Sequence, residues 1–471
     1  STRPTASPAP AATPHRAAPA AARAAEPAVR AALPPAAPAG LEQLLSPVSV
    51  QEFEADYWEK RPLHVQRPFP PAYQSLLRGQ DLPTLAAGLE RQGLEVQAFV
   101  DCKRCESHGL LRDFYGAGSV VLNRIDKAWA PLGRLCASLR ERLHHVFAVM
   151  YLTPRGSQAV PAHTDDQDVF VLQLAGCKHW RVYPTPLALP YSHEQLGKDQ
   201  ASPLTGEMLG NPILELCLRP GELLYLPRGA PHEARADEGA SSLHVTLTAQ
   251  TSDLTWAGLV LDGLQELHRG HAPFRHALPI AMLSGAQGGQ GGAQGGQGAQ
   301  GEGLEAQWQA QWQELMRHSA ERSAEAYGAA LRRLHAKIAK HNAEQDAALR
   351  LLARDEASSP TRPSLLEERL QRTPDLEVEM PEEPPPGTPA GGYAKLIFRK
   401  VVRGVPASME LSVAHAMLPA MRFIASERRP SFYASELPGV DECEQVALVV
   451  RLLEVSVLEV LVPCSESSQR I

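Results

Sequence analysis

Between residues 99 and 250 the chain consists of short runs rich in β-branched and aromatic residues, and each run ends at a turn signal. The runs are VFAVMYLT, QAVPAH, DVFVLQL, KHWRVY, PILELCL, ELLYLP and SLHVTLTAQ. Glycine and proline separate them, at Pro154–Gly156, Ala175–Gly176, Pro220–Gly221 and Arg228–Gly229. Many short strands with such turns are typical of a β-sandwich or barrel. We expect DVFVLQL and KHWRVY to form a hairpin through Gly176.

A histidine and two carboxylates stand directly ahead of one of these strands. In an extended chain His163 and Asp165 face the same side and Asp166 faces the other. His232 follows a Pro-Arg-Gly turn and begins a later strand. Two histidines and one carboxylate form the facial triad that holds Fe(II) in non-haem oxygenases and leaves positions open for a cosubstrate and O2. We therefore predict His163, Asp165 and His232 as iron ligands.

A buried cation is predicted near this triad. A cosubstrate such as 2-oxoglutarate would chelate the iron through its keto acid, and its far carboxylate would then need a cation and hydroxyl donors inside the barrel. Lys178, fifteen residues after His163, is the predicted cation. Tyr151 and Thr248, on the strands before and after, are the predicted hydroxyl donors. The neighbouring His179 and His244 are expected to point to the other face as structural residues.

The remainder of the chain divides by composition. Residues 1–39 are mostly Ala and Pro and predict a disordered leader, although scattered arginines also suit an organelle transit peptide. The barrel is expected over 40–255. Residues 256–354 predict a helical region, either packed on the core or used for dimerisation, with a Gly/Gln-rich insert at 284–303. Residues 355–392 predict a Pro-rich linker, and 393–471 a small α+β domain of winged-helix proportions.

Charge and cysteine content narrow the function classes. The formal net charge of −7 does not favour whole-molecule attraction to nucleic acid or to an acidic membrane. No run of roughly 18 apolar residues occurs, so no membrane-spanning helix is expected. The seven cysteines are few for 471 residues and suggest reduced thiols in an intracellular protein. Direct sequence-specific DNA binding is not expected, because only KLIFRKVVR hints at a basic face.

The motifs of residues 41–255 resemble those of the JmjC-type ribosomal oxygenases, a family described as bifunctional lysine-specific demethylases and histidyl-hydroxylases. The resemblance rests on SPVSVQEFEADYWEKRPLHVQR, YLTPRGSQ, VPAHTDDQDVFVLQLAGCKHWRVY, LRPGELLYLPRGAPHEA and SLHVTLTAQ. It implies a double-stranded β-helix, the jelly-roll barrel of the JmjC and cupin-like proteins, with flanking helices. A helical dimerisation region and a C-terminal winged-helix-like domain would follow.

The resemblance also assigns roles to single residues. It implies iron ligation by His163, Asp165 and His232 and binding of 2-oxoglutarate by Lys178. It places Tyr151 in the substrate groove, with Thr248 where the family usually has Ser, and adds Arg124 of NRIDKAW. Two positions depart from the family pattern, Val149 for the usual Asn and Thr164 for the frequent Tyr, and both concern substrate choice more than the metal.

Three hypotheses for the function follow. The first is hydroxylation of a protein side chain, a histidine of a ribosomal protein, by an Fe(II)- and 2-oxoglutarate-dependent dioxygenase. The second is histone H3 lysine demethylation by the same chemistry, in a chromatin and transcription regulator. The third is a non-catalytic dimeric scaffold, against which the intact triad argues. The resemblance implies a homodimer in the nucleus, including the nucleolus.

Overall fold

The computed structural model describes residues 29–30, 40–198, 204–270, 272–277, 298–358, 364–381, 392–402, 405–426 and 431–461. The predicted leader therefore lies outside the described residues, apart from the two-residue strand β1 (Val29–Arg30). Residues 284–297 of the predicted Gly/Gln insert also lie outside them. Among the described residues, no helix combines the length and apolarity needed to cross a bilayer.

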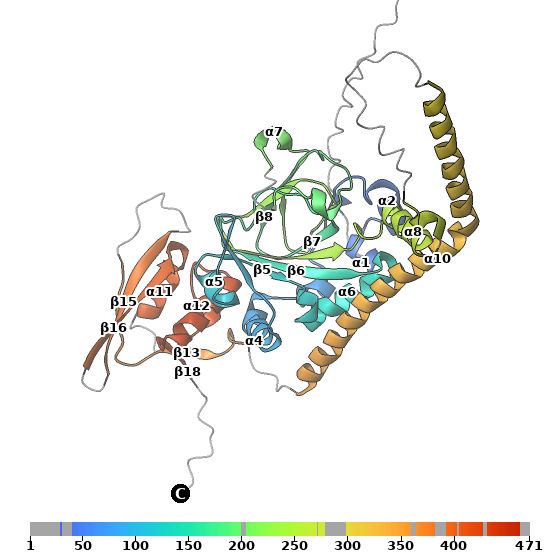
Figure 1. Ribbon diagram of the computed structural model, residues 1–471. Coiled ribbons are helices and arrows are strands. Elements are labelled where there is room, and N and C mark those ends of the chain that lie inside the picture. Colours follow the sequence, from blue (N-terminus) through green and yellow to red (C-terminus); the bar gives the residue numbers. More distant parts are fainter. Residues whose placement is uncertain are drawn as a thin grey trace, which may run out of the picture.

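Two sheets, mostly antiparallel, form the barrel at the centre of Figure 1. The order of the large sheet is β1, β2 (Leu63–Gln66), β10 (Leu223–Leu226), β7 (Asp168–Ala175), β12 (Ser242–Ala249), β6 (Val146–Thr153), β5 (Ser119–Asn123), β3 (Gln97–Val100) and β4 (Lys103–Cys105). The order of the small sheet is β11 (His232–Ala236), β8 (Lys178–Val182) and β9 (Leu214–Leu218). Only the β1–β2 pair in these sheets is parallel.

The predicted hairpin of DVFVLQL with KHWRVY is wrong. These segments are β7 and β8, which lie in different sheets. Both edges of β7 are already hydrogen-bonded, to β10 and to β12, so β8 has no free edge of β7 to join. Gly176 makes the passage between the sheets with a φ of 63°, and a Cβ there would lie 1.7 Å from the Ser241 carbonyl oxygen. The turn signal was therefore correct, but it marks a change of sheet.

Alternation along β6 separates the core from the barrel interior. Ala148, Met150 and Leu152 are fully buried in the main hydrophobic core, which the helix α6 (Ala130–Leu143) covers. Tyr151 and Thr153 point to the opposite face, between the two sheets. The N-terminal helices α1 (Leu41–Leu45), α2 (Val50–Asp56), α3 (Pro71–Gln74), α4 (Leu82–Gln92) and α5 (Leu110–Tyr115) add to the same core.

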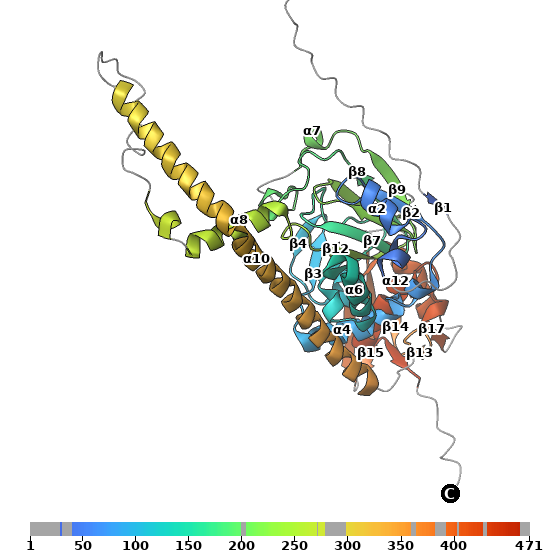
Figure 2. The same ribbon diagram turned by 90° about the vertical axis from the view of Figure 1, so that its right-hand side faces the viewer.

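In the described part of the chain, two long helices follow the barrel. The first is α8 (Trp256–Gly270), and the second is the long helix α10 (Gly298–Ser358), which crosses the molecule diagonally beside α6 (Figures 1 and 2). They approach closely, since a Cβ at Gly263 would lie 2.2 Å from the Tyr327 ring. Because α10 begins at Gly298, the last residues of the predicted insert are helical.

A C-terminal unit follows α10. Its helices are α11 (Leu418–Ala425) and α12 (Glu442–Glu454), and its strands are β13 (Arg369–Arg372), β14 (Glu377–Glu379), β15 (Tyr393–Val402), β16 (Val405–Ala414), β17 (Phe432–Tyr433) and β18 (Leu458–Val460). The prediction of a linker over 355–392 is wrong in part, because β13 pairs with β17 and β18, and β14 pairs with β15. Both strands occupy the proline-free runs of that segment, and Leu370 is fully buried.

The C-terminal unit packs directly on the barrel and its N-terminal helices. Helix α12 lies against α4 and α5, and its side chains join the main core of the barrel. The side chain of Asp441 caps the helix by accepting from the Glu444 N–H. The Glu444 carboxylate is buried and pairs with Arg155 in the turn after β6. This unit is therefore part of one body with the barrel.

Candidate metal centre

Two histidines face each other between the sheets. His163 and His232 form an isolated antiparallel bridge, with backbone N–H to O=C distances of 3.1 and 2.9 Å. Their ring centroids are 4.4 Å apart, and both side chains are buried. The bridge sets the two imidazoles side by side, although they lie 69 residues apart in the chain.

The third group of the predicted triad completes the cluster. Asp165 lies in the loop between His163 and β7, where its carbonyl oxygen accepts from the Gly229 N–H at 2.8 Å. Its carboxylate oxygens lie 3.8 Å from His163 Nε2 and 3.7 Å from His232 Nε2. Ligand atoms of the three residues all lie within 4.8 Å of one another, a spacing that suits one metal ion.

The far nitrogen of each imidazole is held by the backbone. His163 Nδ1 lies 2.8 Å from the Pro161 carbonyl oxygen, and His232 Nδ1 lies 3.0 Å from that of Ala230. A carbonyl can only accept, so each Nδ1 carries the proton and each Nε2 keeps its lone pair toward Asp165. The hydrogen bonds thus select the tautomer that a metal requires.

The protonation states also suit a divalent cation. Burial lowers the pKa of His163 to about 3 and lowers the pKa of His232. Burial alone would raise the pKa of Asp165, but Lys198 and the two histidines outweigh it and hold this pKa well below its usual value. At neutral pH the cluster therefore offers two neutral imidazoles and one carboxylate.

Lys198, which sequence reasoning missed, belongs to a strap over the cluster. Its ammonium lies 2.6 Å from Asp165 Oδ1. The strap, residues 192–198, is tied to the ligand segment because Thr164 N donates to Leu196 O and Leu196 N donates to Thr164 Oγ1, both at 2.9 Å. Asp166 accepts from Ser192 and Gln195 on the same strap. Thr164, the departure from the family pattern, thus has a local role in this chain.

The cluster opens into a cavity between the sheets. The lining residues are Tyr151, Ala159, Val160, His163, Asp165, Val169, Val171, Lys178, Trp180, His232, Ala234, His244 and Thr246. Lys178 is 2% exposed, and its ammonium donates to Thr153 Oγ1 at 3.1 Å. Burial lowers the pKa of Lys178 to about 7. A buried cation facing an apolar cavity suits an anionic ligand.

Tyr151 lies in the cavity as predicted, and Thr248 does not. Thr248 is opposite Phe147, two residues beyond the cavity-lining Thr246 on the same face of β12. The hydroxyl beside Lys178 belongs to Thr153 instead. The expectation that His244 points away is also wrong, since it shares the face of Thr246 and stacks on Tyr151 at 4.7 Å. The alternation of side chains along a strand puts His244 on the same face as Thr246 and Thr248, so the sequence alone could have predicted its position.

Two further predictions concern residues outside the cavity. His179 is on the outer face of β8, where it pairs with Asp237 at 3.0 Å, as expected of a structural residue. Arg124 follows β5 and does not line the cavity. Its guanidinium lies over the Phe147 ring and pairs with Asp126. The structure thus brings together the triad, Lys178 and Tyr151, and leaves Arg124 and Thr248 further along the sheet.

Comparisons with known proteins agree with this geometry. Residues 124–255 match the model of the JmjC domain family. Ribosomal oxygenase 2 of Bos taurus is 35% identical over 258 residues, covering 49% of this chain and 52% of the relative. The bifunctional lysine-specific demethylase and histidyl-hydroxylase NO66 of Aedes aegypti is 32% identical over 255 residues, covering 50% of this chain and 39% of the relative.

The E. coli ycfD structure has 16% identity and a TM-score of 0.42, and the match covers 88% of this chain and 98% of that one. The chain spans about half the length of the curated relatives it matches. The match at 124–255 includes the triad, Lys178 and Tyr151. The chain therefore carries a JmjC domain, related to those of the ribosomal oxygenases and of the NO66 demethylase and histidyl-hydroxylase proteins.

Proposed function

We propose that this protein is an Fe(II)- and 2-oxoglutarate-dependent dioxygenase that hydroxylates a protein side chain, a histidine of a ribosomal protein. The observation that carries the proposal is one cavity that holds both a His-Asp-His cluster and a buried lysine. Two relatives support the substrate class, since one is named ribosomal oxygenase and another histidyl-hydroxylase.

The donor set fits Fe(II). His163, Asp165 and His232 would hold the ion through two Nε2 atoms and one carboxylate, a facial arrangement that leaves coordination positions open. Iron with 2-oxoglutarate and O2 supplies the oxidising chemistry that converts a C–H bond to C–OH while 2-oxoglutarate becomes succinate and CO2. The Pro161 and Ala230 carbonyls would keep both imidazoles oriented during that chemistry.

Lys178 and Thr153 would hold the cosubstrate. The ammonium would pair with the far carboxylate of 2-oxoglutarate, and the Thr153 hydroxyl would keep the ammonium aimed into the cavity. Val169, Val171 and Trp180 are buried apolar residues of the cavity lining. An ion pair gains strength in such low-dielectric surroundings. Tyr151, stacked on His244, would form one wall for the substrate side chain.

Lysine demethylation of histone H3 is the second candidate, and the name of the Aedes aegypti relative favours it. The reaction would use the same cluster and hydroxylate an N-methyl group. Recognition of a methylammonium group by aromatic rings needs open ring faces around the cation. Among the described residues lining the cavity, Tyr151 and His244 stack on each other and Trp180 meets His244 at 74°. This arrangement supports the hydroxylase over the demethylase.

The regions around the barrel complete the proposal. We infer that residues 256–354 form a homodimerisation region and that the C-terminal unit is a winged-helix-like domain without sequence-specific DNA binding. Its α12 is engaged with the barrel, and Lys395 and Arg399 on β15 are paired with carboxylates. Ribosomal-protein or histone substrates would place the protein in the nucleus, including the nucleolus.

Mass spectrometry of candidate peptides tests the proposal. Purified protein is incubated with Fe(II), 2-oxoglutarate, ascorbate and either ribosomal-protein or methylated histone peptides. We expect one added oxygen atom on a histidine, lost in His163→Ala and retained in His179→Ala, because the side chain of His179 lies on the outer face of β8 and pairs with Asp237. Loss of methyl groups would favour the demethylase, and unmodified peptides together with bound iron would contradict both.

A further inference from the structure

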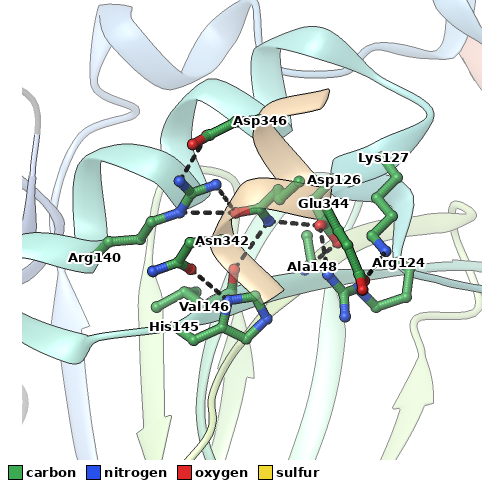
Figure 3. A network of polar contacts seen from close by, with 11 residues as sticks. Arg124, Asp126, Lys127, Arg140, His145, Val146, Ala148, Asn342, Glu344 and Asp346 are labelled. Atoms are coloured by element: carbon green, nitrogen blue, oxygen red, sulfur yellow. Dashed lines mark hydrogen bonds and ion pairs between the residues drawn. The ribbon is translucent and has the colours of Figure 1, made fainter. Parts of the chain in front are cut away.

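Helix α10 inserts a fully buried amide into the catalytic domain. The Gln345 side chain accepts from Arg140 Nε at 2.9 Å and donates to the Val146 carbonyl oxygen at 3.1 Å. Its third partner is Asp126 Oδ2, at 2.5 Å. Figure 3 shows this network, in which Asn342 and Asp346 of the same helix also contact His145 and Arg140. The helix is therefore tied to the barrel by specific polar contacts.

Asp126 transmits this contact toward the sheet. The carboxylate is 0% exposed, and its Oδ1 accepts from the Ala148 N–H at 3.0 Å. Its Oδ2 is shared between Gln345 and Arg124 Nη2, which lies 3.3 Å away. A buried carboxylate needs all of its donors, because a buried acceptor without a partner has lost its hydrogen bonds to water and gained none in return. The Gln345 amide thus helps to fix the oxygen that orients Arg124.

Arg124 is held in an unusual conformation with donors to spare. Its backbone is left-handed, with φ at 60°, which non-glycine residues seldom adopt. Its guanidinium lies 5.0 Å above the Phe147 ring centroid, and the side chain is 31% exposed. Among the described residues, its buried Nε has no hydrogen-bond partner. A partly exposed and permanently charged guanidinium suits an anionic acceptor supplied from outside the protein.

A row of side chains connects Arg124 to the metal centre. Phe147, Val149 and Tyr151 alternate along β6 and therefore share one face, and Tyr151 lines the cavity. Val149 also packs in a small apolar cluster with Val121. Four residues of strand span about 13 Å. An extended peptide with one side chain in the cavity would cross this row and bring a residue about four positions away to Arg124.

We propose that Gln345 is a positioning residue for substrate selection. It fixes Asp126, which fixes Arg124, which binds an acidic side chain about four residues from the modified one. The inference rests on the proposed function, since it assumes a peptide substrate of the cavity. It links helix α10, which lies outside the barrel, to substrate choice in the JmjC domain.

The experiment measures binding and turnover separately. The probes are fluorescent 13-residue peptides with a central histidine in an Ala/Gly background and one glutamate moved through every other position. Fluorescence anisotropy on the full chain gives Kd without any need for catalysis. We expect the wild type to prefer glutamate about four residues from the histidine, on one side only, by about tenfold, which corresponds to one charge-assisted hydrogen bond.

Two variants are compared with the wild type. Gln345→Glu keeps the size of the side chain and its acceptor for Arg140 but removes the donor to Asp126, and we expect it to abolish the preference. Glu344→Gln, at the next position, breaks only the exposed pair with Lys127 and should keep it. Thermal midpoints confirm folding, and Arg124→Met should reproduce the loss if Gln345→Glu does not fold. The KM for 2-oxoglutarate should stay within about twofold in every folded variant.

The outcomes separate the inference from the function on which it rests. A wild type with no positional preference, or a Gln345→Glu variant that keeps it, overturns the inference. A parallel fall in peptide affinity, 2-oxoglutarate affinity and thermal midpoint would also overturn it, because a purely structural role predicts that pattern. Positional binding without hydroxylation of any peptide would instead contradict the proposed function and leave the link from α10 to Arg124 standing.

Discussion

At the residue scale, Lys178 makes cosubstrate binding depend on pH. Its lowered pKa, about 7, means that the free enzyme loses the ammonium as pH rises above neutrality. Binding of a carboxylate then requires proton uptake, so the KM for 2-oxoglutarate should rise from pH 7 to 9, by up to about tenfold per pH unit. In Lys178→Met the KM should be high and almost independent of pH, whereas Thr153→Val should keep the pH dependence. A flat wild-type profile would contradict this role.

The buried carboxyl of Asp168 should make the free energy of unfolding depend on pH. Burial raises its pKa to about 6, although the hydroxyls of Tyr225 and Thr251 donate to it at 2.6 and 2.7 Å. Between pH 4 and 6 the native state keeps a proton that the unfolded chain loses, so this carboxyl lowers the free energy of unfolding as pH rises. The total effect is about 3 kcal/mol.

Chemical denaturation of the wild type and Asp168→Asn at several pH values isolates this effect. Asparagine does not titrate, so the stability advantage of the wild type over the variant should shrink by about 2 kcal/mol between pH 4 and 7. A difference that stays constant over this range would show that the carboxyl titrates alike in both states.

At the element scale, the strap of residues 192–198 depends on one glycine. Gly197 has a φ of 81°, and a Cβ there would lie 2.2 Å from the Ala162 carbonyl oxygen and 2.8 Å from His163 Cα. Gly197→Ala should push the strap from the metal ligands and weaken Mn(II) binding, measured by calorimetry, by about tenfold or more. Gly206→Ala is the matched control, since nothing lies within 4 Å of a Cβ there. Equal affinities for the two variants would exclude a role of the strap at the cluster.

The elements also show which parts of the site were predictable. His163, Asp165, Lys178 and His232 each belong to a short local motif from which a role in binding a metal or an anion can be predicted. Lys198 and Thr153 gain their roles only through contacts across the barrel, and no local pattern marks them. Thr248 was wrongly placed in the cavity. The alternation of side chains shows which face of β12 it occupies, but its position along the strand relative to the cavity depends on how far the small sheet extends.

At the scale of the whole molecule, the sequence predicted the order of the regions better than the contacts between them. The buried pair of Arg155 with Glu444 connects residues 289 apart in sequence, and the packing of α12 on α5 connects segments still further apart. Such long-range docking leaves no periodic signal. Prolines between residues 355 and 392 suggested a linker because they are dense on average, although β13 and β14 lie in the gaps between them.

Removal of one partner of the Arg155–Glu444 pair tests this contact between the C-terminal unit and the barrel. Arg155→Met should leave the Glu444 carboxylate buried, with its side chain 4% exposed and without its cation. Breaking a buried pair in this way costs about 3–5 kcal/mol. We expect chemical denaturation to show a loss of that size, and the double variant Arg155→Met with Glu444→Leu to recover most of it. An unchanged midpoint in the single variant would mean that the pair does not hold the C-terminal unit to the barrel.

The proposed homodimer makes the last prediction. Helix α8 exposes Trp256 at 84% and Leu261 at 60%, and α10 exposes Met316 at 38%. Apolar side chains on two adjacent helices suit burial against a second copy, because a two-fold axis would pair the same surface with itself. Analytical ultracentrifugation should show a dimer for the wild type and a monomer for Leu261→Glu with Met316→Glu. Leu351→Glu, at an exposed leucine far along α10, is the control. A wild-type monomer at micromolar concentration would assign these helices to another partner.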